Sequence, residues 1–167
     1  MGIYDNGVIM KDIKKNVEIY TDGACSGNPG RGGYGTILKF GKATKELSEG
    51  FELTTNNRME ILAAVKGLEA LNQPCNVKLT SDSKYLVDSV NQGWIIKWQK
   101  NNWMRTKSEK AKNIDLFKRL LTQLEIHSVE FIWVKGHAGH PMNERCDQLA
   151  VNAYNSDNLI VDTGFLE

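Results

Sequence analysis

The first half of the chain has a pattern of apolar and polar positions that predicts three consecutive β-strands. In residues 17–22 alternate side chains fall on opposite faces of an extended chain, and Asp22 stands at its end. Two further strand-like segments, 33–40 and 43–53, are separated only by Gly41 and Lys42. Because so short a polar turn joins antiparallel strands, the pattern predicts a three-stranded antiparallel meander.

In the second half the apolar period changes, and helices alternate with strands. Helices are predicted over residues 58–71 and 114–124, from residues 81–83 to near Gly93, and onward from Pro141, with strands over 77–80 and 129–134. This order predicts an α/β domain with a mixed five-stranded sheet, three antiparallel strands followed by parallel additions, and helices on both faces. We expect one domain over residues 17–154, an N-terminal extension over 1–16 and a C-terminal tail over 155–167.

Composition narrows the class of protein. With 41% apolar and 25% charged residues, the 167-residue chain has ordinary globular composition. It has no apolar run of ~20 residues, so we expect no membrane span, and its start lacks the features of a secretory signal. The three cysteines are widely spaced and form no C-x-x-C pair. This pattern argues against a disulfide framework and indicates the reducing cytoplasm.

The net charge of +1 hides a strongly basic segment. Six cations lie between residues 97 and 112 with a single acid, Glu109, and they are Lys97, Lys100, Arg105, Lys107, Lys110 and Lys112. Trp94, Trp98 and Trp103 are interleaved with them. The segment predicts a phosphate-binding stripe whose affinity falls as salt rises. Trp94 and Trp98 have helical i, i+4 spacing, and we assign at least Trp98 to packing.

Four acids stand at positions suited to chemistry, and each also has a structural explanation. Asp22 precedes Gly23 at a strand end, where Asp commonly forms turns. Glu60 follows Asn57 at the spacing of a capping box, and Asp82 could cap the helix it precedes. Asp147 lies in mid-helix, and no cation stands three or four residues away to pair with it.

Acids at element junctions of an α/β sheet can converge on a ligand site. Like charges about 4 Å apart repel by ~4 kcal/mol at an effective dielectric of 20, so a converging cluster needs cations. Oxygen ligands suit Mg²⁺ or Mn²⁺. The alternative is a zinc site built from His137, His140 and Cys146. Spacing alone leaves convergence open.

Four segments together resemble a known family. The stretches TDGACSGNPGRGGYG, TTNNRMEILAAVKGLEAL, LTSDSKYLVDSV and FIWVKGHAGHPMNERCDQLA, in this order, are similar to those of the bacterial type 1 ribonuclease H family. The resemblance implies a ribonuclease H-like fold and a monomeric endonuclease that hydrolyses the RNA strand of RNA–DNA hybrids. It implies two Mg²⁺ ions, or Mn²⁺ in their place, and products with 5′-phosphate and 3′-hydroxyl ends.

The same resemblance assigns roles to the candidate residues. Asp22, Glu60, Asp82 and Asp147 become the metal-binding catalytic acids, with Asp22 bridging the two ions, Glu60 and Asp82 on the side of the attacking water, and Asp147 on the leaving-group side. His137, in a glycine-flanked loop, becomes a catalytic histidine, although a surface histidine without a role is the alternative. Glu144 becomes an auxiliary residue near the second metal.

Substrate contacts follow from the resemblance as well. The implied set comprises Cys25, Asn28, Thr55, Asn56, Asn57, Lys84, Trp94, Lys97, Lys100 and Lys112. The asparagines also suit turns and caps, and Lys84 departs from the glutamine expected at its position. The basic segment corresponds to a protrusion that grips the DNA strand. Two alternatives remain, a non-catalytic nucleic-acid binding module of the same fold and a metal-dependent nuclease or phosphatase of another specificity.

Overall fold

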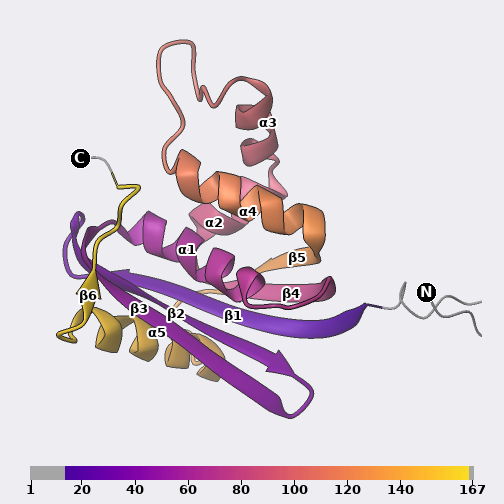
Figure 1. Cartoon of the computed structure of the whole chain (residues 1–167), viewed down its shortest axis with the longest axis vertical. Helices are drawn as coiled ribbons and strands as arrows, with labels where there is room; N and C mark the ends of the chain where they lie inside the picture. Colours follow the sequence, from indigo (N-terminus) through magenta and orange to yellow (C-terminus); the bar gives the residue numbers. More distant parts are fainter. Residues whose placement is uncertain (1–13, 166–167) are drawn as a thin grey trace, which may run out of the picture.

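The computed structural model describes residues 14–165, in which six strands form one mixed sheet with helices on both faces (Figure 1). The strands are β1 (Lys15–Cys25), β2 (Gly30–Phe40), β3 (Ala43–Thr54), β4 (Cys75–Ser81), β5 (Ser128–Trp133) and β6 (Leu159–Ile160). The helices are α1 (Asn56–Glu69), α2 (Lys84–Asn91), α3 (Trp94–Lys100), α4 (Ile114–Ile126) and α5 (Pro141–Tyr154). The strand order across the sheet is β5-β4-β1-β2-β3-β6.

The antiparallel meander is confirmed. β1 pairs with β2 and β2 with β3 in antiparallel fashion, and the register places Asp22 opposite Gly35. β4 and β5 then add in parallel on the other side of β1. The carboxyl ends of β1, β4 and β5 therefore lie at one edge of the sheet, and the first acid of the predicted site stands there.

The prediction of five strands was wrong by one. β6 joins the sheet edge through parallel pairing of Leu159 with Gly50 and of Ile160 with Phe51. Two residues are too few to show a period of two, so the pattern gave no sign of this strand. At the other end of the chain, the predicted extension over residues 1–16 lies outside the described residues except for 14–16, and β1 begins at Lys15.

The helices divide into two layers. α5 lies on one face of the sheet, against β1, β2 and β3, and α1 lies on the other face with α4 packed against it (Figure 1). The alternation of β1 explains this arrangement, because Val17, Ile19 and Thr21 are all buried on the α1 face. Ile19, Met59 and Phe117 are among the fully buried side chains of that layer.

The N-caps of α1 and α2 are not the residues that would explain Glu60 and Asp82 as capping residues. The N-cap of α1 is Thr55, whose hydroxyl accepts a hydrogen bond from the backbone N–H of Arg58. Glu60 therefore takes no part in a capping box with Asn57. The N-cap of α2 is Ser83 and not Asp82. Neither Glu60 nor Asp82 therefore caps a helix, because the hydroxyl of Thr55 or Ser83 already accepts a hydrogen bond from a free backbone N–H at the helix N-terminus.

Glycines bring α5 directly onto the sheet backbone. Gly33, Gly35 and Gly50 face this helix, and a Cβ at Gly35 would overlap the carbonyl oxygen of Cys146. Since no side chain separates the strands from the helix, α5 lies close enough to carry Asp147 toward Asp22.

We expect Gly35→Ala to destabilise the fold by ~2 kcal/mol, because the added methyl has no room between β2 and α5. Urea unfolding followed by circular dichroism measures the loss. Gly41→Asn is the control, since Gly41 faces open space and its φ of 58° suits asparagine. Equal unfolding midpoints for the native protein and Gly35→Ala would refute the close contact.

Candidate active site

Asp22 and Glu60 are held together by one backbone amide. The N–H of Gly23 lies 2.9 Å from Oδ1 of Asp22 and donates to Oε1 of Glu60 at 2.6 Å. Gly23 is itself required for this contact, because a Cβ there would lie 2.5 Å from the backbone nitrogen of Glu60. The glycine lets α1 touch the end of β1, and the residues Asp22 and Glu60 are only 5% and 4% exposed.

Asp82 completes a group of three carboxylates. It follows β4, which lies beside β1 in the sheet, and it offers an oxygen that lies within 4.8 Å of an oxygen on each of the other two acids. Asp147 comes from α5 on the opposite face and lines the same cleft. The four predicted acids thus come from two strand ends and from helices on both faces of the sheet.

Burial and mutual repulsion dominate the electrostatics of the cleft. Burial, followed by the nearby charges of Asp82 and then Asp147, raises the pKa of Asp22 from 3.8 to about 9. Burial, with the charge of Asp22 next, also raises the pKa of Glu60 well above its ordinary value. Within residues 14–165 no Lys or Arg forms an ion pair with these acids. An uncompensated, oxygen-only donor set of this kind fits a hard divalent cation.

The zinc alternative is wrong. Nδ1 of His140 accepts a hydrogen bond from the N–H of Asn143 at the start of α5. Cys146 is fully buried, and its thiol donates to the carbonyl oxygen of Tyr20 at 3.3 Å. The only cluster of three potential metal ligands in the described part of the chain is Asp22, Glu60 and Asp82.

His137 lies at the acidic cleft, whereas Glu144 stands outside its lining. His137 is exposed in the loop between β5 and α5, has a φ of 55°, and lines the cleft together with Asp147. Glu144 is exposed in the first turn of α5. The loop therefore brings an imidazole side chain to the mouth of the site.

Several predicted substrate contacts surround the start of α1. Oδ1 of Asn28 accepts a hydrogen bond from the N–H of Asn56 at 3.1 Å, and the thiol of Cys25 donates to the carbonyl oxygen of Thr54 at 3.5 Å. Cys25, Asn56, Asn57 and Lys84 line the acidic cleft. Asn28, Thr55 and Asn57 also line an adjoining hollow, where Lys112 approaches them. The structure therefore joins most of the predicted contact residues into one continuous surface.

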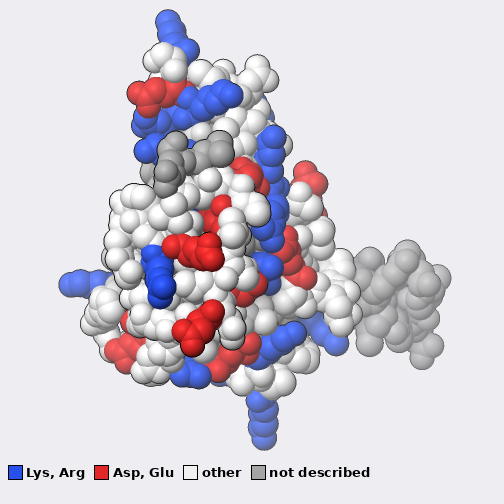
Figure 2. Space-filling model, turned by 60° about the vertical axis from the view of Figure 1, so that its left-hand side comes forward, with Lys and Arg blue, Asp and Glu red and all other residues white. Residues whose placement is uncertain are grey.

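The remaining predicted contacts lie on a separate projection. Trp94, Lys97 and Lys100 belong to α3, which with the segment after it stands at the top of Figure 1. Figure 2 shows Lys and Arg side chains gathered at this end of the molecule. The assignment of Trp98 to packing is confirmed, since its ring centroid lies 5.9 Å from that of Phe117. Trp94 is 37% exposed, so its ring remains accessible.

Comparison with known proteins decides the family. The model of the RNase H family matches residues 14–155, a span that contains all four acids and His137. The chain belongs to the RNase H family.

Curated members of the RNase H family match along nearly their whole length. A Ribonuclease H from Desulforamulus reducens is 58% identical over 148 residues, covering 89% of this chain and 93% of the relative. A Ribonuclease H from Rippkaea orientalis is 58% identical over 153 residues, covering 92% and 94%. These matches extend the family relationship over most of the chain.

Solved RNase H structures share the fold. LC9-RNase H1, described as a type 1 RNase H with the type 2 active-site motif, superposes with a TM-score of 0.76 at 29% identity, covering 91% of this chain and 79% of that one. LC11-RNase H1 in complex with an RNA/DNA hybrid gives 0.64 at 25% identity, covering 83% and 96%. No helix in residues 14–165 is both long enough and apolar enough to cross a bilayer.

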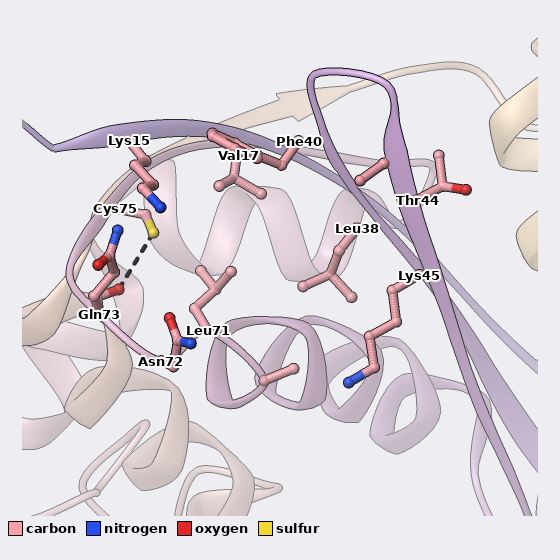
Figure 3. Close-up of a pocket in the computed structure, with 12 residues that line it drawn as sticks. Lys15, Val17, Leu38, Phe40, Thr44, Lys45, Leu71, Asn72, Gln73 and Cys75 are labelled. Carbon is pink, nitrogen blue, oxygen red and sulfur yellow. Dashed lines mark hydrogen bonds between the residues drawn. The ribbon is translucent and has the colours of Figure 1, made fainter.

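Another hollow of this RNase H lies at the opposite end of β1 from Asp22. Figure 3 shows its lining, which includes Val17, Leu38 and Leu71 with Lys15 and Lys45 at the rim. The thiol of Cys75 donates to the carbonyl oxygen of Gln73 at 3.2 Å. Among the described residues, those that line this hollow include no acid and no histidine.

Sequence reasoning missed a buried ionic network next to the site. The side chain of Arg58 is only 3% exposed, and its guanidinium donates to both carboxylate oxygens of Asp115 and of Asp162 at 2.7–3.0 Å. Thr54 donates to Asp162 as well, at 2.7 Å. The partners are 57 and 104 residues from Arg58 in the chain. No local pattern signals such distant pairs.

Proposed function

We propose that this chain is a ribonuclease H that hydrolyses the RNA strand of RNA–DNA hybrids and leaves 5′-phosphate and 3′-hydroxyl ends. The observation that carries the proposal is the group formed by Asp22, Glu60 and Asp82, with Asp147 lining the same cleft, in a member of the RNase H family. Buried carboxylates without cationic partners suit a metal-assisted hydrolysis, in which negative charge develops on phosphate and on two oxygens.

The four acids would hold two Mg²⁺ ions, or Mn²⁺ in their place. When bound, the ions supply Lewis-acid stabilisation of charge on the attacking and leaving oxygens and lower the pKa of the attacking water. The amide of Gly23 orients the Glu60 carboxylate, and the glycine contacts under α5 fix the position of Asp147. His137, at the mouth of the cleft, would exchange a proton with the reacting groups or with the departing product.

Residues on two surfaces would hold the hybrid. Telling RNA from DNA requires contact with 2′-hydroxyls across a shallow minor groove, which short polar side chains and backbone can make. Cys25, Asn28, Thr55, Asn56 and Asn57 supply such groups around the start of α1. The basic projection, with Trp94, Lys97 and Lys100, would take the phosphates of the DNA strand together with Lys112 at the hollow beside α1. LC11-RNase H1, which shares the fold, is known in complex with an RNA/DNA hybrid.

The proposal includes the organisation of the chain. Residues 17–154 form the catalytic domain, residues 1–16 an N-terminal extension and residues 155–167 a C-terminal tail, part of which pairs with β3 through β6. We place the protein in the cytoplasm as a monomer. Glu144 retains the auxiliary role assigned to it, although it stands in the first turn of α5 outside the lining of the cleft.

A substrate comparison tests the function. The protein is incubated with labelled RNA–DNA hybrid, duplex DNA and duplex RNA, each with Mg²⁺, with Mn²⁺ and with EDTA. We expect cleavage of the RNA strand of the hybrid alone, and only with metal. If the hybrid remains intact with Mg²⁺ and with Mn²⁺, the proposal is contradicted and a non-catalytic binding module is favoured. Cleavage of duplex DNA at a similar rate would indicate a nuclease of another specificity.

Salt dependence tests the role of α3. For the double variant Lys97→Gln and Lys100→Gln, we expect the slope of log K against log[salt] for hybrid binding to become shallower by about 1.4–1.8, since two phosphate contacts are lost. Fluorescence anisotropy in EDTA measures the slope without cleavage. Lys78→Gln on β4 is the control, because Lys78 is exposed but stands outside both hollows at the site. A native slope in the double variant contradicts the assignment.

A further inference from the structure

Trp133 combines high exposure with contacts to the acidic cleft. It is the last residue of β5, an edge strand of the sheet, and 44% of it is exposed. Exposed tryptophans in isolation need no explanation, but this one makes two specific contacts. Its Nε1–H donates to the carbonyl oxygen of Asp82 at 3.1 Å, and Nζ of Lys84 lies 5.1 Å from its ring centroid.

The first contact holds one of the catalytic acids. Asp82 connects β4 to α2, and the end of β5 restrains it from two directions. The indole N–H of Trp133 binds the backbone of Asp82, and Gly136 lies so close that a Cβ there would be 2.8 Å from Oδ2 of the carboxylate. The N–H of Val134 also donates to the carbonyl oxygen of Ser81 at 3.0 Å. Trp133 is therefore part of the support that fixes the Asp82 carboxylate.

The second contact places a positive charge at the rim of the cleft. Among the described residues, Lys84 is the only Lys or Arg that lines the acidic cleft, and its side chain is exposed at the start of α2. Among the ion pairs formed within residues 14–165, none involves Lys84. An ammonium over an indole face is attracted by about 0.5–1 kcal/mol at an exposed site, which orients the side chain but leaves its charge available.

We infer that Trp133 is a positioning residue that fixes the backbone of Asp82 and holds Lys84 where its ammonium contacts a backbone phosphate of the nucleic-acid strand in the cleft. The inference rests on the proposed function. A lysine acts on phosphate as a point charge and needs no defined hydrogen-bond geometry. The contact is independent of base sequence, so it contributes to affinity and to the salt dependence of binding.

Two variants separate the two contacts. Lys84→Gln keeps a polar side chain and removes the charge, so we expect a hybrid-binding salt slope shallower by about 0.7–0.9 and a higher KM with unchanged kcat. Trp133→Phe keeps an aromatic face for Lys84 and removes the N–H donor. We expect it to keep the native salt slope but to lower kcat by about tenfold, and to weaken binding of Mn²⁺ measured by calorimetry without substrate. Trp133→Tyr provides a second aromatic ring that lacks the indole N–H.

The controls distinguish a failure of this inference from a failure of the proposed function. Native protein must cleave the hybrid, and Lys78→Gln must keep the native slope, KM and kcat. Thermal melting monitored by circular dichroism checks that each variant is folded. A native salt slope in Lys84→Gln overturns the phosphate contact, and native kcat and Mn²⁺ affinity in both Trp133 variants overturn the positioning role. If native protein neither binds nor cleaves the hybrid, the proposed function itself fails.

Discussion

Replacing Asp22 with Asn is expected to abolish hybrid cleavage and, at the same time, to make the metal-free protein more stable at neutral pH. The native carboxyl has a pKa raised from 3.8 to about 9, chiefly by burial and then by Asp82. Between these values the folded chain holds a proton that the unfolded chain has released. The raised pKa of Asp22 therefore costs the folded state nothing below pH ~4. Above that pH the free energy of unfolding falls, until the pH reaches about 9.

The amide side chain of the Asp22→Asn variant cannot ionise, so its free energy of unfolding does not fall for this reason as the pH rises. A shift of one pKa unit corresponds to about 1.4 kcal/mol, and we expect a gain of ~2 kcal/mol or more in the unfolding free energy at pH 8. Urea unfolding in EDTA at pH 5 and pH 8 measures the gain, which should be larger at pH 8. Added Mg²⁺ or Mn²⁺ should stabilise the native protein and have little effect on the variant.

Asp157→Asn is the matched control for this prediction. It removes the same charge from an exposed position in the C-terminal tail. We expect native cleavage and little change in stability, because Asp157 is exposed. Substantial cleavage by Asp22→Asn, or a variant less stable than native protein at pH 8, would show that the cluster is not organised as described.

Removing Asp162 is expected to destabilise the protein by about 3 kcal/mol, one of the largest losses available outside the core. Arg58 is almost fully buried, and Asp162 supplies two of its four carboxylate hydrogen bonds. Asp162→Asn leaves the guanidinium with Asp115 as its only carboxylate partner, and the side chain of Asp115 is 44% exposed. A buried charge that loses a partner costs far more than a surface pair contributes.

The same change should weaken hybrid binding, because Arg58 belongs to the first turns of α1, next to Asn56 and Asn57. Chemical unfolding and anisotropy in EDTA measure the two effects. Glu69→Gln is the control, since it breaks a two-hydrogen-bond pair with Arg119 that is partly exposed on both sides, and it should cost under ~1 kcal/mol. If the Asp162 and Glu69 variants lose equal stability, burial does not strengthen the Arg58 network.

The sequence predicted the elements well where a period was long enough to read. The meander and the alternation that buries Val17 and Ile19 follow from local pattern, and they are observed. β6 was not predicted, because a strand of two residues is too short to show an alternation of apolar and polar positions. The capping explanations considered for Glu60 and Asp82 do not hold, because Thr55 and Ser83 are the N-caps of α1 and α2.

The candidate site depended on more than pattern. Each acid had a structural explanation in the sequence, and only the family resemblance joined the four. The structure supplies the physical cause of convergence, which is the adjacency of β1 and β4 together with the close approach of α1 at Gly23. Arg58 and Trp133 could not be found in advance, because their partners are set by tertiary contact and not by spacing.

The glycine contacts beneath α5 also determine which part of the site can move. A helix packed on side chains can slide as rotamers change, but α5 touches the strand backbone at Gly33, Gly35 and Gly50. The helix that carries Asp147 therefore has little room to shift against the sheet. Within the loop 134–140, Gly136 lies against the Asp82 carboxylate, whereas Gly139 faces open space. We therefore expect substrate entry and product release to proceed by motion of the loop that carries His137, around four acids that stay fixed.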